Sequence, residues 1–236
     1  MKTTFHAANS RGHANHGWLD AHHSFSFASW YNPEKTNFGV LRVLNDDVVA
    51  PAMGFGKHPH DNMEIITIPL EGALTHQDSM GNKATITSGE IQVMSAGTGI
   101  QHSEFNASET EPINLLQIWV FPNKKNVEPR YDQQFIDTQA MQNEFAQILS
   151  PNELDAGVWI HQNAWFHLGE FTVESTKNYQ LKDVSNGVYV FIIEGKATIN
   201  GQELNKRDAI GVWNTEQFDL QISPKSKVLL LEIPMN

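Results

Sequence analysis

Two short stretches of the chain carry side chains of the kinds that bind metal ions. In KHPHDNMEI, His58 and His60 stand two residues apart and are followed by Glu64; in GTGIQHSEF, His102 and Glu104 repeat the spacing of two. Neutral imidazoles together with a carboxylate suit a divalent first-row transition metal. A set of three histidines and one glutamate would leave open positions, at which a metal can bind a substrate oxygen or dioxygen, or polarise a carbonyl.

These residues can converge if both stretches are β-strands. Residues i and i+2 of a strand point to the same face, so His58 shares a face with His60, and His102 shares a face with Glu104. Two such strands lying side by side inside a barrel would gather four donors. The same parity also puts Glu64 on the face of His58 and His60, so strand geometry alone does not decide between Glu64 and Glu104 as a ligand.

The surrounding sequence predicts an all-β protein. Short apolar or alternating runs, separated by turn residues such as Gly81-Asn82, Ser88-Gly89 and Asn200-Gly201, are typical of sandwiches and barrels. Strands are expected in the ranges 38–49, 63–72, 73–79, 83–95, 113–122, 158–173, 188–201, 209–214 and 227–234. The helix-like spacing that follows Asp137 predicts one helix, and the polar segment 121–134, with two prolines, predicts a linker.

The two halves of the chain resemble each other. IPLEGALTHQDSMGNKATITSGEIQVMS and FIIEGKATINGQELNKRDAIGVWN share an order of apolar strand, Glu-Gly, strand, turn and two further strands. A repeat of this size indicates two copies of one β domain, each with its own core. We expect domains at residues 1–130 and 131–236.

Composition excludes several classes of protein. The 236 residues include no cysteine, so disulfides, thiolate ligands and cysteine nucleophiles are excluded. The formal net charge is −11, whereas a protein that binds nucleic acid directly usually presents a basic face. There is no apolar signal-peptide core and no run approaching the ~18 apolar residues of a membrane span. We expect a cytoplasmic protein that binds neither nucleic acid nor membrane directly.

The two histidine stretches resemble the two cupin motifs, and in detail they resemble the pirin-like branch of that superfamily. HPHDNMEIITIPLEG and the lengthened SAGTGIQHSE carry the likeness, with support from RGHANHGWLDAHHSFSF and DSMGN. Three positions depart from the general cupin pattern: Ala52 stands where the first glycine is expected, seven residues instead of six precede Gly72, and Ser95 replaces a proline. The resemblance implies two tandem cupin (double-stranded β-helix, or jelly-roll) domains, a bicupin.

The resemblance also implies a ligand set. In pirin-like proteins both histidines of the first motif and the histidine and glutamate of the second hold the metal, which here means His58, His60, His102 and Glu104. Glu64 would then lie beside the ligands and orient one of them. The resemblance implies one divalent ion, Fe(II) first, with Mn, Co, Ni, Cu or Zn as alternatives. The second domain lacks these ligands, since its matching positions are Leu181 and Asp183.

Three functions are compatible with such a site. Bacterial pirin-like proteins resemble quercetin (flavonol) 2,3-dioxygenases, in which Glu104 would take the proton of the flavonol hydroxyl before dioxygen opens the ring and carbon monoxide leaves. The alternative is a non-catalytic pirin that acts as a redox-sensitive regulator of a protein partner, and a third is a cupin isomerase or epimerase of a sugar. A cavity beside the metal would favour the enzyme over the regulator. We expect a monomer, because one chain already contains a pair of cupins.

The remaining histidines and aromatic residues have simpler interpretations. His76 and His161 are expected on strands with local hydrogen-bond partners, and His13, His16, His22 and His23 on the surface or in structural hydrogen bonds. A second group could line a substrate pocket or fill the barrel core: Phe55, Met63, Met94, Ile100, Phe105 and Trp119.

Overall fold

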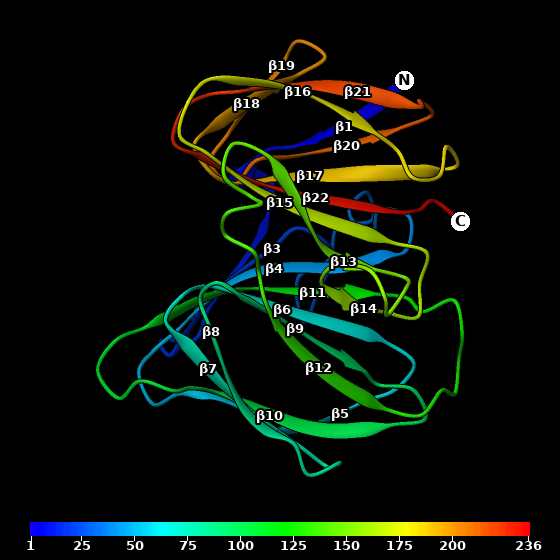
Figure 1. Ribbon diagram of the computed structural model, residues 1–236. Coiled ribbons are helices and arrows are strands. Elements are labelled where there is room, and N and C mark those ends of the chain that lie inside the picture. Colours follow the sequence, from blue (N-terminus) through cyan, green and yellow to red (C-terminus); the bar gives the residue numbers. More distant parts are fainter.

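The computed structural model describes residues 1–236 and consists almost entirely of β-strands, which confirms the all-β prediction. Four sheets stack as layers: two seven-stranded sheets lie in the middle, and a four-stranded sheet lies outside each of them (Figure 1). The one helical element is a single 3₁₀ turn, η1 (Ala8–Ser10). No helix has the length and apolar character needed to cross a membrane.

The first barrel is formed mainly by the first half of the chain. Its large sheet has the order β12 (Arg130–Phe135), β9 (Glu90–Ser95), β6 (Glu64–Glu71), β11 (Ile113–Val120), β4 (Leu41–Val49), β3 (Leu19–His23), β2 (Gly12–Asn15). Its small sheet has the order β5 (Gly54–His60), β10 (Ile100–Asn106), β7 (Ala73–Asp78), β8 (Lys83–Thr87).

The second barrel repeats this strand order, except that the last pair of its large sheet is parallel whereas β3 and β2 are antiparallel. Its large sheet has the order β1 (Lys2–His6), β20 (Ala209–Trp213), β17 (Asn186–Glu194), β22 (Ser226–Pro234), β15 (Trp165–Phe171), β13 (Phe145–Ser150), β14 (Val158–Trp159). Its small sheet has the order β16 (Ser175–Gln180), β21 (Gln217–Ile222), β18 (Lys196–Ile199), β19 (Gln202–Asn205). The Glu-Gly turns of the two repeats match as well, with φ of 80° at Gly72 and 78° at Gly195.

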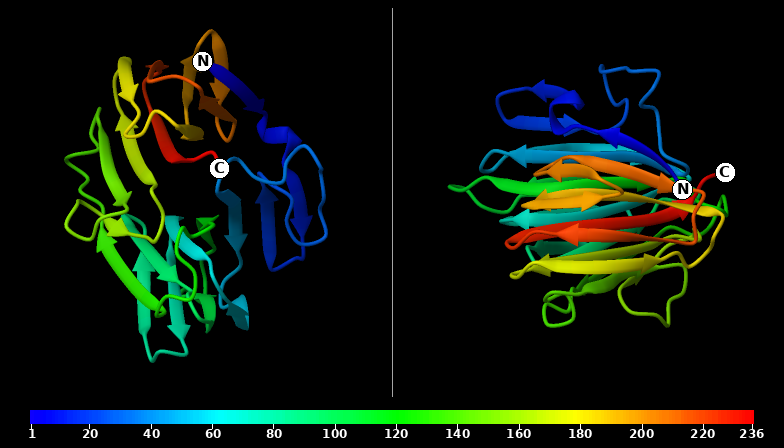
Figure 2. Two further views of the ribbon diagram at one scale, coloured as in Figure 1. Left: turned by 90° about the vertical axis from the view of Figure 1, so that its right-hand side faces the viewer. Right: turned by 90° about the horizontal axis from the view of Figure 1, so that it is seen from above.

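The two halves exchange their leading strands. β1 pairs with β20 of the second barrel, from Lys2 opposite Trp213 to His6 opposite Ala209. β12 pairs with β9 of the first barrel, from Arg130 opposite Ser95 to Phe135 opposite Glu90. In the view along the barrels, the N-terminal strand accordingly lies with the C-terminal half (Figure 2). We propose a division of the chain near residue 130, with the first strand of each half completing the large sheet of the other half.

The largest core lies between the two large sheets. A cluster of 29 buried residues combines side chains of both halves, among them Leu116 and Ile118 of β11 with Phe191 of β17 and Leu229 of β22. Strands of the large sheets are therefore covered on both faces, which explains their nearly continuous apolar sequences. Strands of the small sheets are covered on one face only: β10 alternates between buried and more exposed residues along its length.

Two expectations from the sequence were wrong. The residues after Asp137 form a turn, in which the Asp137 carboxylate accepts hydrogen bonds from the backbone N–H groups of Gln139 and Ala140, and the chain then enters β13. No helix forms, because the apolar residues of this segment pack in a sheet. The end of the expected linker 121–134 is likewise a strand, β12.

Candidate metal centre

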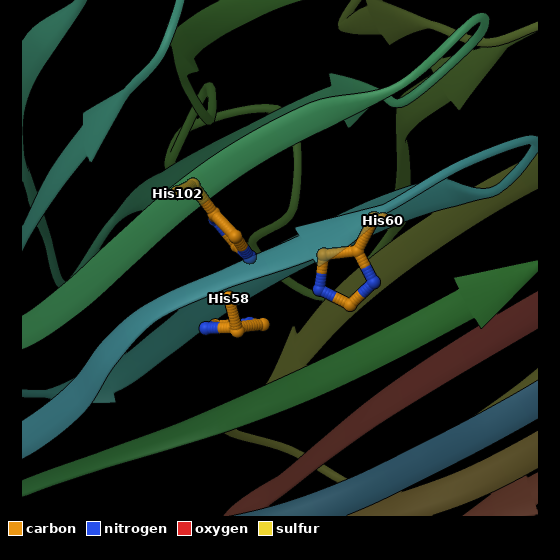
Figure 3. A group of neighbouring side chains, drawn as sticks. All are labelled: His58, His60 and His102. Atoms are coloured by element: carbon orange, nitrogen blue, oxygen red, sulfur yellow. The ribbon is translucent and has the colours of Figure 1, made fainter.

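The small sheet of the first barrel brings the two histidine stretches together. β5 and β10 are antiparallel neighbours, with His58 opposite His102 and His60 opposite Ile100. His58 and His60 point to the same side, as the alternation predicts, and their ring centroids lie 4.9 Å apart. Each of the three histidines offers one ring nitrogen within 4.8 Å of the others. The three side chains lie close together beside β5 and β10, and the ring of His102 points toward those of His58 and His60 (Figure 3).

Two of the three histidines, His60 and His102, are held in the neutral form that binds a metal ion. Burial, and then the neighbouring His58, lowers the pKa of His60 to about 4. Burial, together with the other histidines around it, lowers the pKa of His102 to about 2. At neutral pH both rings therefore keep a free nitrogen lone pair, which is the form that coordinates metal ions.

The hydrogen bonds of two histidines support this interpretation. Nδ1 of His58 donates to the carbonyl oxygen of Gly56 at 2.8 Å, so Nε2 is the nitrogen left as an acceptor or ligand. Both ring nitrogens of His102 are buried and have no hydrogen-bond partner. Buried polar atoms are rarely left without a partner, and a bound divalent ion would satisfy one nitrogen of His102. The residues present thus fit a metal.

Glu104 is positioned by the large sheet that faces it. Its side chain is 2 % exposed, and its Oε2 accepts a hydrogen bond of 3.1 Å from Nε2 of Gln117. Thr67, opposite Gln117 in the sheet, lies 3.5 Å from Oε1 of Glu104 but donates its hydrogen over the shorter distance of 3.1 Å to Oε1 of Gln117. Burial raises the pKa of Glu104 to about 7, against the hydrogen bond from Gln117. The carboxyl group can therefore both give and take a proton near neutral pH.

His76 joins the centre, a position that the sequence did not reveal. The pairing of β7 with β10 places His76 opposite Glu104, and one donor atom each of His76, His102 and Glu104 lie within 4.8 Å of one another. His102 is thus common to two groups, one with His58 and His60 and one with His76 and Glu104. The alternation of β7, in which Leu74, His76 and Asp78 are the buried residues, already indicates that His76 faces the barrel interior. Placing His76 beside Glu104 also requires the sheet order, in which β7 is the neighbour of β10.

Glu64 lies outside both groups. The strand that carries His58 ends at His60, and Asn62 has a φ of 45°, so the parity of β5 does not continue into β6. The Glu64 carboxylate accepts a hydrogen bond of 2.6 Å from Ser95 and lies near Arg130 and the backbone N–H of His161. Arg130 in turn donates to the carbonyl oxygen of Trp159 at 2.6 Å. Glu64 therefore belongs to a polar contact between the two halves of the chain.

A cavity of about 430 Å³ opens beside the histidines, within the range typical of small-molecule sites. His58, His60 and Glu104 contribute to its wall. Its other lining residues are aromatic, polar or glycine: Trp18, Phe27, Phe55, Trp119, Asn45, Asp47, Gln117, Gly54 and Gly56.

Only part of the expected aromatic and apolar lining is found there. Phe55 and Trp119 line the cavity, and the ring of Trp119 lies 4.9 Å from that of His60. Met94 and Ile100 instead belong to a small buried apolar cluster, against which Met63 and Trp119 pack. Phe105 points away and is 41 % exposed.

Asp47 is a second buried carboxyl group in the cavity wall. It is 4 % exposed, and its Oδ1 has no hydrogen-bond partner. Burial raises the pKa of Asp47 to about 8, and the nearby carboxylates of Asp46 and Glu104 add to the rise. At neutral pH the group is mostly protonated and can donate a hydrogen bond to a ligand in the cavity.

The other histidines have structural or surface positions. His13 and Asp20 lie 2.6 Å apart on the surface, near His22, with side chains 52 % and 44 % exposed for the first two. Nδ1 of His23 donates to Oδ1 of Asn45 at 3.0 Å. These residues behave as expected from the sequence and do not contribute to the cavity.

Comparison with known proteins agrees with the fold. Residues 4–120 match the Pirin family, and residues 147–233 match the quercetinase C-terminal cupin domain. The chain is 43% identical over 227 residues to the quercetin 2,3-dioxygenase of Escherichia coli (strain K12), which covers 96% of each chain. It is 41% identical over 222 residues to the pirin-like protein of Caulobacter vibrioides, which covers 94% of this chain and 95% of that one.

A solved structure extends the likeness to three dimensions. The Escherichia coli bacterial pirin YhhW in complex with nickel(II) superposes with a TM-score of 0.93 at 41% identity, over 99% of both chains. Both halves and their order along the chain are therefore shared with these proteins. The chain belongs to the pirin family and has its two-cupin fold.

Proposed function

We propose that the protein is a metal-dependent dioxygenase that cleaves a flavonol such as quercetin with dioxygen and releases carbon monoxide, acting in the cytoplasm as a monomer. One observation supports this most directly: a cavity with aromatic walls opens on His58 and His60 and includes Glu104. A flat, polyhydroxylated aromatic substrate suits such walls. The name of the related Escherichia coli enzyme points to the same substrate class.

The proposed metal ligands are His58, His60, His102 and Glu104. A divalent ion bound there would supply Lewis acidity toward a substrate hydroxyl and the electron transfer that dioxygen chemistry requires. Fe(II) is our first assignment, with Mn, Co, Ni, Cu and Zn as alternatives. The nickel complex of YhhW supports a divalent ion in a protein of this fold.

Glu104 is the proposed catalytic base. Its carboxyl group lines the cavity, and its pKa of about 7 lets it accept the proton of the flavonol hydroxyl near neutral pH. Gln117 holds one oxygen of the carboxylate, which leaves the other oxygen for the ion and for the incoming proton. Proton transfer to Glu104 leaves the flavonol as its anion, the form that reacts with dioxygen.

Asp47 would recognise a second oxygen of the substrate. Its unpartnered Oδ1 lies in the wall of the cavity beside Asn45, and the protonated carboxyl group can donate to a carbonyl or hydroxyl oxygen. The substrate would thus be held between the Glu104 side and the Asp47 side, with its rings against Trp119 and Phe55.

The cavity also bears on the alternative function, a regulator that binds a protein partner and reads the state of the metal. Such a protein needs no room for a small molecule beside the histidines. The open aromatic cavity therefore favours the enzyme.

The test is aerobic turnover of quercetin. Protein loaded separately with Fe(II), Mn(II), Co(II), Ni(II) or Cu(II) is mixed with quercetin, and the loss of substrate and the release of carbon monoxide are followed. We expect metal-dependent turnover that disappears in Glu104→Gln and in His60→Ala but persists in His16→Ala, which removes an exposed histidine. Stoichiometric metal without turnover by any of the ions would reject the dioxygenase and leave the regulator.

A further inference from the structure

β7 places two further polar side chains against the metal centre. His76 lies opposite Glu104, and Asp78 lies opposite His102. Both side chains are completely buried, with an exposure of 0 %. Nε2 of His76 and Oδ2 of Asp78 are 3.3 Å apart. The pair is too deep to serve a surface role, and it lies behind the histidines that face the cavity.

The turn that follows β7 fixes Asp78 as a hydrogen-bond acceptor. Its Oδ1 accepts from the backbone N–H groups of Met80 at 2.9 Å and Asn82 at 3.0 Å, and its Oδ2 accepts from Nδ2 of Asn82 at 2.8 Å. Burial favours the neutral acid, but the hydrogen bonds from Asn82, His76 and Met80 outweigh it and lower the pKa of Asp78. Asp78 is therefore an anion with no hydrogen to donate.

An anionic Asp78 determines the tautomer of His76. Because the carboxylate can only accept, the hydrogen between the two groups must belong to Nε2 of His76. A neutral imidazole with its hydrogen on Nε2 carries none on Nδ1. Nδ1 of His76 is then a pure acceptor, and it is buried without a hydrogen-bond partner. Tyr131 packs on the ring, with centroids 4.8 Å apart, and restricts its rotation.

His102 needs a hydrogen-bond acceptor of this kind. Its ring centroid lies 5.3 Å from that of His76, and neither of its nitrogens has a partner. When one nitrogen of a histidine binds a metal, the other carries a hydrogen and normally donates it to an acceptor that orients the ring. Gly56 provides this acceptor for His58. The acceptor without a partner beside His102 is Nδ1 of His76.

We propose that Asp78 and His76 are a positioning pair that accepts the ring N–H of His102, fixes its orientation and tautomer, and thereby strengthens metal binding. The inference rests on the metal centre proposed above. It does not depend on which reaction the centre performs, because its readout is metal affinity.

The test measures Ni(II) affinity of the full-length protein by competition with a chromophoric chelator. His76→Phe keeps an aromatic ring but removes both nitrogens, and we expect binding ~10- to 100-fold weaker than in the wild type. Asp78→Asn places an amide N–H against Nε2 of His76, which forces the hydrogen to Nδ1 and removes the acceptor; the expected loss is of the same size. His167→Phe, a buried histidine of the second barrel, is the matched control and should bind Ni(II) as the wild type does.

A readout on the wild-type protein keeps the inference testable if a variant folds poorly. Long-range proton–nitrogen NMR of the imidazoles in the metal-free protein should find His76 as the tautomer with hydrogen on Nε2, and in Asp78→Asn as the tautomer with hydrogen on Nδ1. Affinities of folded His76→Phe and Asp78→Asn within threefold of the wild type, or hydrogen on Nδ1 of His76 in the wild type, would overturn the inference. A wild-type protein that binds no Ni(II) would instead reject the proposed metal centre itself.

Discussion

The two barrels share one strand order but differ in what fills them. In the second barrel, a cluster of 16 buried apolar residues, including Leu220, Ile199 and Val190, occupies the space between the large and the small sheet. In the first barrel, the corresponding space holds His76, His102 and Glu104. Every buried polar side-chain atom without a hydrogen-bond partner belongs to a residue between Ser24 and Trp119. The unsatisfied polar groups therefore collect in the barrel that has the cavity.

The second barrel also buries a carboxylate, and the contrast with Glu104 is instructive. Glu232 accepts hydrogen bonds from the hydroxyl of Tyr179 at 2.8 Å, from the backbone N–H groups of Lys182 and Asp183, and from the side-chain amide of Asn186 at 3.0 Å. It needs nothing from outside the protein. Glu104 has one firm hydrogen bond, from Gln117. A fully satisfied polar group stabilises a fold, whereas a partly satisfied one is available to a ligand.

The largest expected effect is on activity, from a histidine of the first barrel. His102→Ala should abolish metal binding and reduce flavonol turnover by ~10³-fold or more, because several kcal/mol of transition-state stabilisation depend on the ion. Metal content after dialysis and quercetin consumption are the measurements. The free energy of unfolding of the metal-free protein should fall by no more than about 2 kcal/mol, because the packing lost around the buried ring is partly offset by removal of an imidazole without hydrogen bonds. A His102→Ala protein that still holds a stoichiometric amount of metal would show that the unsatisfied groups of the first barrel are not the metal site.

In the second barrel we expect a substitution to reduce stability but not metal binding. Glu232→Ala leaves several buried donors without an acceptor and should lower the free energy of unfolding by about 3–4 kcal/mol. Metal content per folded molecule should stay at the wild-type level. Urea unfolding and metal analysis together test this, with the exposed Glu216→Ala as control. A loss of metal from folded Glu232→Ala would mean that the second barrel supports the site after all.

Glu64, between the barrels, should make stability depend on pH. Burial raises its pKa from 4.5 to about 7, against the hydrogen bond from Ser95 and the charge of Arg130. Its contribution to stability is thus fully present below about pH 4.5 and is lost as the pH rises through about 7. Glu64→Gln cannot ionise, so its stability relative to the wild type should rise by about 3 kcal/mol between pH 4 and pH 8.

The measurement is urea unfolding of both metal-free proteins across this pH range. The difference between the two proteins cancels the titration of the buried histidines, whose lowered pKa values act at the acid end. A difference that stays constant with pH would show that Glu64 is ionised in a more polar environment than its burial indicates.

The smallest effect is expected from removing the exchanged strand β1. Deletion of residues 1–6 removes the edge strand of the second barrel's large sheet and the contact between His6 and Tyr189. Because most of β1 is exposed, we expect a loss of about 1–2 kcal/mol. Amide hydrogen exchange should increase in β20 and remain unchanged in β9 of the first barrel. Equal changes in both strands would contradict the assignment of β1 to the second barrel.

The sequence predicted the central strands of the large sheets well, and predicted several edge strands and small-sheet strands less well. Runs such as INLLQIWV are apolar almost throughout because both faces of the strand are buried, and they are easily recognised between polar segments. β16 and β21 alternate with exposed polar residues, and β12 had the composition of a linker. Their strand character comes from the neighbours with which they pair, which no local pattern contains.

The candidate site, like the strands, could be predicted only as far as local sequence patterns reach. Local spacing selected the pairs His58/His60 and His102/Glu104, each of which lies on one strand, whereas only the resemblance to pirin-like proteins favoured Glu104 over Glu64 as a ligand. The strand parity that was extended from His60 to Glu64 does not hold, because β5 ends at His60 and Asn62 has a left-handed backbone conformation. His76 and Asp47 were missed as parts of the centre because they reach it from β7 and β4, and only the sheet order brings these strands to β10 and the cavity.

The exchange of leading strands has a consequence for biosynthesis. β12 meets β9 as soon as both have been made, whereas Lys2 must wait for Trp213. At ~5–20 residues per second, β1 remains without its partner for roughly ten to forty seconds on the ribosome. During this interval the first barrel can close and enclose its histidines, while the N-terminal strand offers unpaired backbone groups to any strand nearby. The edge of the second large sheet is therefore completed only after β20 has been synthesised.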